Sequence, residues 1–121
     1  MLPFFFIRHK GRLVKLITAD IRYIEASKNY AKIYTGSQLF VTLATLQRLE
    51  AALPPEEFIR IHRSFLVSVS HLTGFDRRCV YLEGRHLPIG DTYYASLLHR
   101  FAVIGSPEPR TPVRKLPQLN R

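Results

Sequence analysis

Apolar and polar residues alternate along the first third of the chain, which is the pattern of β-strands that each bury one face. This pattern predicts five consecutive strands, at residues 4–7, 13–17, 21–26, 30–34 and 38–42. Polar turns separate them, and the first of these is a basic turn that pivots on Gly11. Residues 18–20 are expected to form a single helical turn. The short connections predict hairpins and mostly antiparallel sheets.

The spacing of apolar residues changes after residue 42, and the new spacing predicts an α-helix. Three leucines recur at intervals of three and four residues, as they do on one helical face: Leu46, Leu49 and Leu53. Thr42 or Thr45 can cap the start of this helix with its hydroxyl group. Pro54 and Pro55 are expected to end it, because proline lacks the backbone N–H that a helix needs.

Residues 58–68 combine two patterns in one segment. Residues 60–62 alternate polar and apolar, which predicts a half-exposed strand, and 65–67 form a continuous apolar run. Such a run indicates a strand that is buried on both faces, or on one face next to a bend. Four polar residues gather at the junction: Arg60, His62, Arg63 and Ser64. A rigid apolar base that holds such side chains outward is suited to presenting hydrogen-bond donors to an anion.

The remainder of the chain is expected to form short strands and one more helix. The strand through Val67 is expected to continue past Val69 and Leu72 and to close at Gly74. Two further strands are predicted at residues 79–82 and 86–89. A last helix is expected to carry three aromatic or aliphatic residues on one side: Tyr93, Leu97 and Phe101.

These elements predict one mostly β domain with small antiparallel sheets and short helices. Its expected bounds are residues 1–103, and scattered prolines and charges indicate a flexible, Pro-rich basic tail at 104–121. With 121 residues the chain is long enough for one domain and too short for two. The apolar start, residues 1–7, has no basic segment before it, so it predicts a first strand and not a signal peptide.

The charge balance points to a polyanionic partner. Eighteen lysines and arginines oppose nine acidic residues, and the net charge is +9. A merely basic surface is the alternative explanation. No apolar run approaches the roughly 20 residues of a membrane span, so no membrane insertion is expected. The single cysteine, Cys79, cannot form an internal disulfide, which is compatible with the cytoplasm as the expected compartment.

Enzyme chemistry has little support in the sequence. There is no Gly-rich phosphate loop and no cysteine or histidine spacing of a metal site, so neither a cofactor nor a metal is expected. A small hydrolase that uses Cys79 with a histidine is one hypothesis. The simpler interpretation is that Cys79 begins an apolar strand as a small core residue. We therefore expect the protein not to be an enzyme.

Several polar residues are candidates for nucleic-acid contacts, and each has a structural alternative. Lys28 and Asn29 can reach bases or phosphates, but they equally suit an ordinary turn, and Tyr30 suits the core. Arg63 can make a bidentate contact with guanine, or it can be a solvated surface residue.

Three further residues, His62, Asp91 and Thr92, are less clear candidates. His62 can instead be a half-buried residue that holds its loop by a hydrogen bond. Asp91 suits a helix N-cap better than an anion site. Thr92 can meet a phosphate together with free N–H groups at the start of the last helix.

Four segments together resemble the LytTR DNA-binding domain, the output domain of a class of bacterial response regulators. They are Ile21-Arg22-Tyr23-Ile24-Glu25-Ala26-Ser27-x-Asn29-Tyr30, Leu46-x-x-Leu49 with Leu53, Phe58 to Val67 around Arg-Ile-His-Arg-Ser, and Leu87-Pro88-Ile89-Gly90 with Tyr93. The resemblance covers residues 4–102. It implies an elongated stack of small antiparallel sheets with two or three short helices, whose loops enter successive major grooves of bent DNA, usually at paired direct repeats.

The resemblance also implies roles for individual residues. The turn at Lys28, Asn29 and Tyr30 matches the first base-contacting loop, and Arg63 falls at a base-reading position of the second. Ser64 falls at a phosphate-contacting position beside it, and Asp91 and Thr92 fall in the third contact region. With the neighbouring polar residues, the expected DNA-binding set is Lys28, Asn29, Tyr30, Lys32, Arg60, His62, Arg63, Ser64, Asp91 and Thr92.

Two departures from the family pattern matter. The third region often carries arginine where Asp91 stands, and an aspartate repels phosphate although it can accept a hydrogen bond from cytosine N4. Family members usually carry an N-terminal receiver or membrane sensor domain, whereas this chain starts at the DNA-binding domain. Two alternatives follow: a stand-alone regulator, with a sensor kinase or receiver partner supplied in trans, or a piece of a longer regulator. The expected function is sequence-specific double-stranded DNA binding by a bacterial transcriptional regulator, with a homodimer on DNA. The alternative is a protein-interaction module of the same fold.

Overall fold

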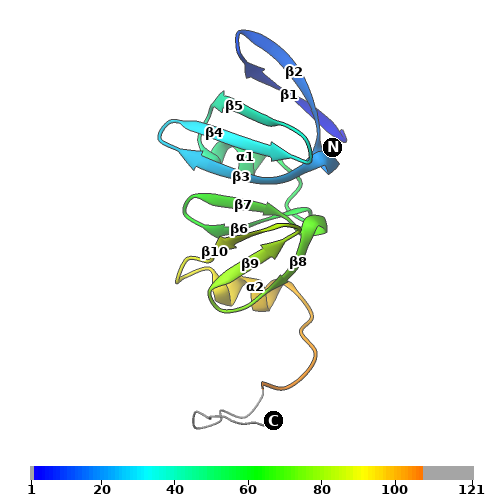
Figure 1. Cartoon of the computed structure of the whole chain (residues 1–121), viewed down its shortest axis with the longest axis vertical. Coiled ribbons are helices and arrows are strands. Elements are labelled where there is room, and N and C mark those ends of the chain that lie inside the picture. Colours follow the sequence, from blue (N-terminus) through cyan, green and yellow to red (C-terminus); the bar gives the residue numbers. More distant parts are fainter. Residues whose placement is uncertain (1, 108–121) are drawn as a thin grey trace.

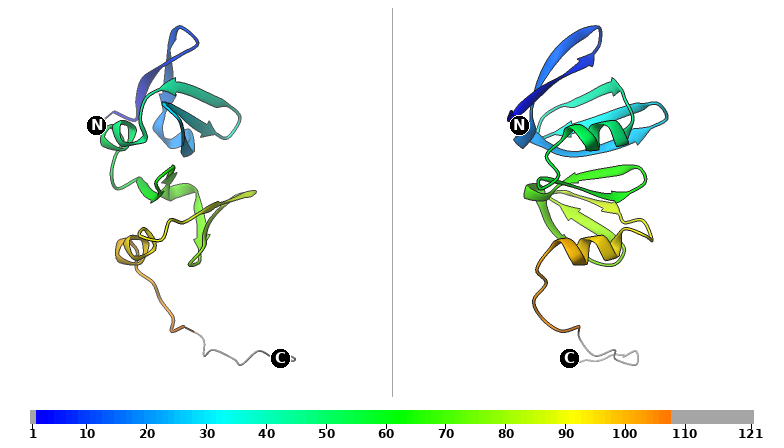
Figure 2. Two further views of the ribbon diagram at one scale, coloured as in Figure 1. Left: turned by 90° about the vertical axis from the view of Figure 1, so that its left-hand side faces the viewer. Right: turned by 180° about the vertical axis from the view of Figure 1, so that it is seen from behind.

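Three antiparallel sheets follow one another along the long axis of the molecule, as Figure 1 shows for the computed structural model, which describes residues 2–107. Within these residues the strands are β1 (Phe4–His9), β2 (Arg12–Ile17), β3 (Ile21–Ser27), β4 (Tyr30–Thr35), β5 (Leu39–Leu43), β6 (Phe58–His62), β7 (Phe65–Ser68), β8 (Leu72–Phe75), β9 (Cys79–Leu82) and β10 (Arg85–Pro88). The helices are α1 (Leu46–Ala52) and α2 (Tyr94–Arg100), with the 3-10 helices η1 (Thr18–Asp20) and η2 (Val69–His71). Both α-helices lie on the same side of the stack (Figure 2). The predicted elongated stack of small antiparallel sheets is confirmed.

The first sheet is the hairpin of β1 and β2, whose turn is as tight as its sequence predicts. Lys10 and Gly11 both have positive φ, 52° and 76°, which places both in the left-handed region. The inward face of the hairpin buries Ile7 and Leu16. His9 anchors the hairpin to the second sheet, because its Nδ1 lies 3.1 Å from the backbone N–H of Val41, which donates to it.

The central sheet has the strand order β5-β4-β3-β7-β6, and both of its faces are covered. On one face Leu66, Ile24 and Ile33 lie across three neighbouring strands and pack towards the hairpin and α1. On the other face Val67 and Tyr23 pack towards the third sheet and α2. Leu66 and Val67 are both fully buried, so the strand predicted to be buried on both faces is confirmed.

The third sheet, of order β10-β9-β8, forms a second core with α2. Val80 of β9 and Leu97 of α2 are fully buried in this core, together with Ile61 and Val67 of the central sheet. Arg85 joins this sheet to the central one, because it donates a hydrogen bond to the Tyr23 hydroxyl and lies over the Tyr23 ring. Tyr34 stacks on Tyr23 with 4.3 Å between ring centroids, and burial raises the pKa of both phenols.

One predicted strand is wrong. The strand expected to run from Val67 past Val69 and Leu72 ends at Ser68, and η2 turns the chain into the third sheet. The backbone N–H of Val69 donates to the Glu57 carbonyl, and the Ser68 hydroxyl lies 3.1 Å from His71 Nδ1. The Val69 bond continues the β6–β7 register by one position, whereas the Ser68 side-chain contact with His71 is local and competes with a continued strand. Gly74 does not close a strand but lies inside β8.

The helix starts give one confirmed and one wrong prediction. Thr45 caps α1, since its hydroxyl accepts the backbone N–H of Arg48 at 3.1 Å, and Thr42 does not. Neither Asp91 nor Thr92 caps α2, because the helix begins later, with Tyr93 as the N-cap residue and no side-chain cap. The backbone N–H of Tyr93 instead bonds to the Gly90 carbonyl in a preceding turn.

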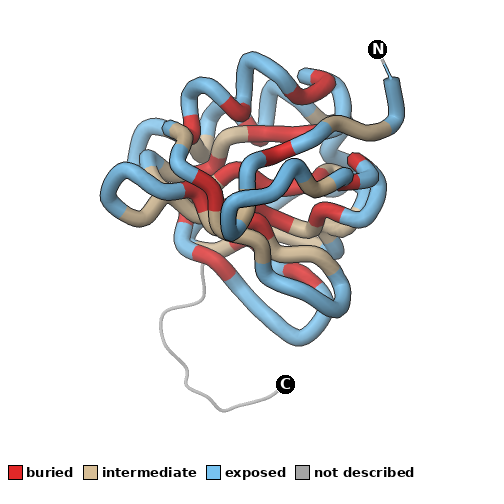
Figure 3. The backbone as a smooth tube through the Cα atoms, turned by 90° about the horizontal axis from the view of Figure 1, so that it is seen from above, coloured by how far each residue is buried: buried red, intermediate tan, exposed pale blue. Residues whose placement is uncertain are grey.

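Buried residues concentrate in the centres of the strands, while the turns are exposed (Figure 3). Most other predicted elements agree with the structure to within one or two residues, including the helical turn Thr18–Asp20. The segment 58–68 is a hairpin of two strands joined at Arg63 and Ser64. Most of the predicted tail, residues 108–121, lies outside the described residues.

Candidate nucleic-acid interface

Three turns, one after another along the stack, project from the same edge of the molecule in Figures 1 and 2. They are the β3–β4 turn at Lys28 and Asn29, the β6–β7 turn at Arg63 and Ser64, and the β10–α2 loop at residues 89–93. We call this set the three-turn edge. It contains most of the residues that the sequence singled out for DNA contacts.

Backbone hydrogen bonds fix the three turns relative to one another. The N–H of Ala26, at the end of β3, donates to the Ser64 carbonyl at 2.8 Å. The N–H of Gly90 donates to the Ile61 carbonyl at 2.8 Å. The second turn is therefore bonded to the strand of the first turn, and the third turn is bonded to β6, the strand that leads into the second turn. The turns of the three-turn edge are therefore linked through the backbone and are not a set of independent loops.

The first turn presents its side chains fully to solvent. Lys28 and Asn29 form a two-residue connection between the paired residues Ser27 and Tyr30. Tyr30 is 49% exposed, so it is a surface residue and not a core residue. Lys28 has a φ of 57°, which a residue with a Cβ adopts only at a cost.

Lys28→Gly is expected to make the protein more stable than Lys28→Ala by about 1 kcal/mol, because glycine relieves the left-handed conformation. Both variants lose the same charge, so the alanine variant is the matched control. Urea unfolding of the two proteins measures the difference. Equal stability would show that the turn carries no strain at Lys28.

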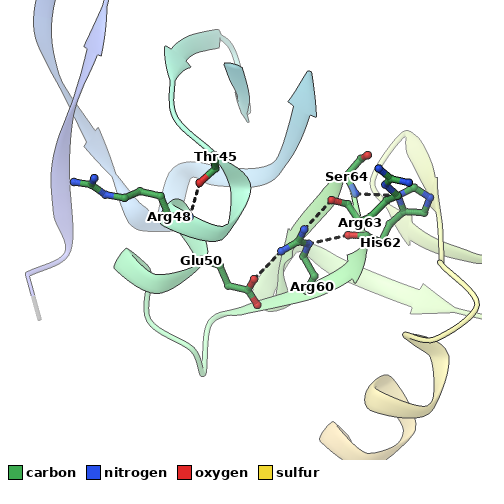
Figure 4. A network of polar contacts seen from close by, with 7 residues as sticks. All are labelled: Thr45, Arg48, Glu50, Arg60, His62, Arg63 and Ser64. Atoms are coloured by element: carbon green, nitrogen blue, oxygen red, sulfur yellow. Dashed lines mark hydrogen bonds and ion pairs between the residues drawn. The ribbon is translucent and has the colours of Figure 1, made fainter. Parts of the chain in front are cut away.

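Arg60 organises the second turn from beneath, as the close view in Figure 4 shows. Its Nε–H donates to the His62 carbonyl at 2.8 Å, and a terminal N–H donates to the Arg63 carbonyl at 2.7 Å. The remaining terminal nitrogen pairs with the carboxylate of Glu50, from α1, at 2.9 Å. The guanidinium group is therefore engaged on three sides. Its contacts are those of a residue that shapes the turn, and whether it also reaches DNA stays a prediction.

His62 holds the same turn by a second contact. Its ring is half-buried, and its Nδ1 accepts the backbone N–H of Ser64 at 3.0 Å. This is the loop-holding hydrogen bond that the sequence offered as the alternative role for His62. Ser64 is half-buried, while the Arg63 side chain is exposed. The turn thus keeps a fixed backbone and directs one free arginine outward.

The third turn shares a hollow with the second. Residues from both turns line a cavity of about 470 Å³: His62, Arg63, Ile89, Gly90, Asp91, Thr92 and Tyr93. Asp91 and Thr92 are exposed at its rim, close to Arg63. A Cβ atom on Gly90 would come within 2.9 Å of the Tyr93 ring, so glycine allows the loop to close against it.

Lys32 is placed differently from the other predicted residues. It lies within β4 and is half-buried. In the strand register it stands opposite Glu25 of β3 and Val41 of β5. It therefore belongs to the sheet behind the first turn and does not line the hollow. The structure brings His62, Arg63, Asp91 and Thr92 together, and it places the first turn beside them along the edge.

Sequence reasoning missed Glu50 as part of this region. Glu50 is ten residues from Arg60, on a different element, and it has no motif of its own. Only the packing of α1 beside β6 brings the two together.

No cluster of three or more histidine, cysteine, aspartate or glutamate side chains suited to a metal is present in residues 2–107. Within the same residues, no helix has the length and apolar character needed to cross a membrane. Cys79 is a half-buried free thiol whose backbone N–H donates to Asp76.

The family model described as the LytTr DNA-binding domain matches residues 11–102. The chain belongs to the LytTR DNA-binding domain family. DNA binding is therefore its function, and an interaction module without DNA binding is not favoured. The LytTr DNA-binding domain of a Bacillus cereus protein has the same fold, with a TM-score of 0.72 at 20% identity over 83% of this chain and 97% of that one.

Curated relatives match part of this chain and are much longer than the matched region. The CO-responsive transcriptional regulator RcoM of Rhodospirillum rubrum is 39% identical over 62 residues, 50% of this chain and 26% of that protein. The sensory transduction protein LytT of Bacillus anthracis is 31% identical over 84 residues, 64% of this chain and 34% of that protein. The chain thus spans about a quarter to a third of the length of these relatives.

Proposed function

We propose that this LytTR domain reads double-stranded DNA in a sequence-specific way and serves a bacterial transcriptional regulator. The observation that carries the proposal is the three-turn edge, in which backbone bonds hold Arg63 beside the third turn. A preformed surface loses little conformational freedom on binding, which favours recognition of a defined base sequence. The relatives' names, a transcriptional regulator and sensory transduction proteins, support the regulatory role.

The exposed side chains of the edge suit distinct tasks. Arg63 has no ion-pair partner among the described residues, so its guanidinium is free to bind the O6 and N7 atoms of a guanine. Lys28 and Asn29 are free to contact a neighbouring groove from the first turn. Ser64 and Thr92 have hydroxyl groups that suit phosphate contacts, and phosphate neutralisation supplies most of the affinity of such domains.

Asp91→Asn is expected to raise the affinity for random duplex DNA about threefold at low salt, because it removes a negative charge that faces phosphates. Asp91 is exposed and has no ion-pair partner in residues 2–107. Fluorescence anisotropy with a labelled duplex at 50 and 200 mM salt measures the effect, which should shrink at the higher salt. Unchanged affinity at both salt concentrations would place Asp91 away from the DNA backbone.

The assembly on DNA follows from the family resemblance as part of the proposal. We infer that two copies bind paired direct repeats, and that the domain takes its signal from a sensor kinase or receiver partner. A DNA target puts the site of action in the bacterial cytoplasm.

The direct test is selection from a random duplex library with the purified chain. The expected result is an enriched motif, repeated at about one helical turn of 10–10.5 base pairs if two copies bind. Binding that is salt-sensitive but selects no motif would remove sequence specificity from the proposal. An absence of binding at any salt concentration would overturn the proposal as a whole.

A further inference from the structure

We propose that the β8–β9 turn, with Arg77 and Arg78, forms an additional contact to DNA phosphates beside the third turn. This inference rests on the proposed function, and it adds a fourth element to the three-turn edge. Neither arginine belongs to the set that the sequence or the family resemblance assigned to DNA.

The β8–β9 turn is bonded directly to the third turn. The backbone N–H of Ile89 donates to the Arg78 carbonyl at 2.9 Å. In Figure 1 the end of the third sheet that carries this turn lies next to the β10–α2 loop. The hydrogen bond keeps the backbone of Arg78 beside residues 89–93. A duplex that reaches the third turn therefore comes close to both arginines, whose side chains are exposed.

Arg77 and Arg63 line two different hollows, and Asp91 lines both of them. A hollow of about 410 Å³ lies between the β8–β9 turn and α2, lined by Arg77, Gly90, Asp91, Tyr94, Ala95 and Leu98. The Arg77 guanidinium lies over the Tyr94 ring, 5.4 Å from its centroid. Stacking on an aromatic face holds an arginine in place and leaves its N–H groups free in the ring plane. Arg77 is thus positioned beside the third turn by a contact with α2.

Asp76 fixes the turn and does not pair with Arg77. One carboxylate oxygen of Asp76 accepts the backbone N–H groups of Arg78 and Cys79, and the other accepts the Tyr81 hydroxyl at 2.6 Å. These bonds lower the pKa of Asp76, and the bond from the Tyr81 hydroxyl contributes most. The carboxylate therefore stays charged. No ion pair within residues 2–107 involves either arginine of the turn. Their positive charge remains available to a ligand.

The charge of the third turn explains why such a contact is needed. Residues 89–93 contain one charged residue, Asp91, and no lysine or arginine. A loop with only a negative charge would be repelled by the phosphates on both sides of a groove. Arg77 and Arg78 change the net charge around the third turn from negative to positive, although neither residue belongs to that turn. The two arginines then offset the charge of Asp91 where phosphates approach the third turn.

The test compares Arg77→Gln and Arg78→Gln with Arg48→Gln, which removes the same charge from α1. The Arg48 side chain points away from the second turn in Figure 4 and towards the hairpin. The expected result for Arg77→Gln is a three- to tenfold weaker binding to random duplex at 100 mM salt. The slope of log affinity against log salt should fall by about 1, the value for one lost phosphate contact. Arg48→Gln should leave both quantities near those of the wild type.

A second measurement locates the contact. Hydroxyl-radical footprinting on a duplex that carries the selected motif should lose protection at one flank with Arg77→Gln. Equal salt slopes for Arg77→Gln, Arg78→Gln and Arg48→Gln, with an unchanged footprint, would overturn this inference while the wild type still binds DNA. Failure of the wild type to bind any duplex would instead overturn the proposed function. Thermal unfolding checks that each variant is folded.

Discussion

Arg60→Ala is expected to weaken binding to the selected DNA motif by tenfold or more while leaving the salt dependence of binding nearly unchanged. The reason is that Arg60 donates to the carbonyls of His62 and Arg63 and pairs with Glu50. Without these bonds the second turn becomes mobile in the free protein. Ordering the backbone of one residue costs about 1–2 kcal/mol, so fixing two turn residues on binding would lower the affinity by at least tenfold.

The salt dependence separates this role from a direct phosphate contact. A residue that neutralises a phosphate changes the salt slope by about 1 when it is removed. Arg60 is engaged on three sides within the protein, and its side chain is only 22% exposed. We therefore expect Arg60→Ala to lower the affinity for DNA without changing the slope of log affinity against log salt. A slope that falls by about 1, with an ordered turn, would show that Arg60 contacts the DNA backbone directly.

Two further variants sharpen the result. Arg60→Lys keeps the charge but cannot donate to both carbonyls and to Glu50 at once, so it should resemble Arg60→Ala in affinity. Glu50→Gln removes only the partner on α1, and we expect a smaller loss because both carbonyl bonds remain. Amide exchange at Ser64, whose N–H donates to His62, reports the order of the turn. If Arg60→Lys binds DNA as tightly as the wild type, the positive charge at residue 60 is enough to explain its effect on affinity.

The sequence predicts the elements of this region well because their signals are local. The alternation in residues 60–62 and the apolar run in 65–67 depend only on neighbouring residues. The polar junction between them, from Arg60 to Ser64, contains the turn at Arg63 and Ser64 that the structure shows. The expectation that His62 supports this turn by a hydrogen bond needed no more than its place on a half-exposed strand.

Long-range contacts are what the sequence does not predict. The bond between Ile89 and Arg78 and the ion pair between Glu50 and Arg60 join residues from different elements that no spacing rule connects. The assignment of Asp91 as a helix cap failed for a related reason. Aspartate is a common N-cap residue, but here residues 90–93 form a turn closed by the Tyr93 N–H to Gly90 carbonyl bond, and the helix begins after it, while Gly90 is also bonded to the distant Ile61.

Arg63→Ala is expected to lower discrimination at one base pair of the selected motif by about 1–3 kcal/mol, the range for one bidentate arginine–guanine contact. The turn itself should remain intact, because Arg60 bonds to the Arg63 carbonyl and not to its side chain. Arg63→Lys is the matched control. It keeps the charge and the backbone, but an ammonium group cannot reproduce the planar, two-pronged contact.

The two Arg63 variants separate base reading from phosphate binding. If Arg63 reads a guanine, both variants lose preference at the same base pair, and only the alanine variant also loses affinity for random DNA. A panel of duplexes with single base substitutions measures the preference, and the selected motif supplies the starting sequence. Wild-type preference in Arg63→Ala would assign the base reading to the first turn, where Lys28 and Asn29 are equally exposed. Retained preference in Arg63→Lys alone would mean that a point charge at this position is enough.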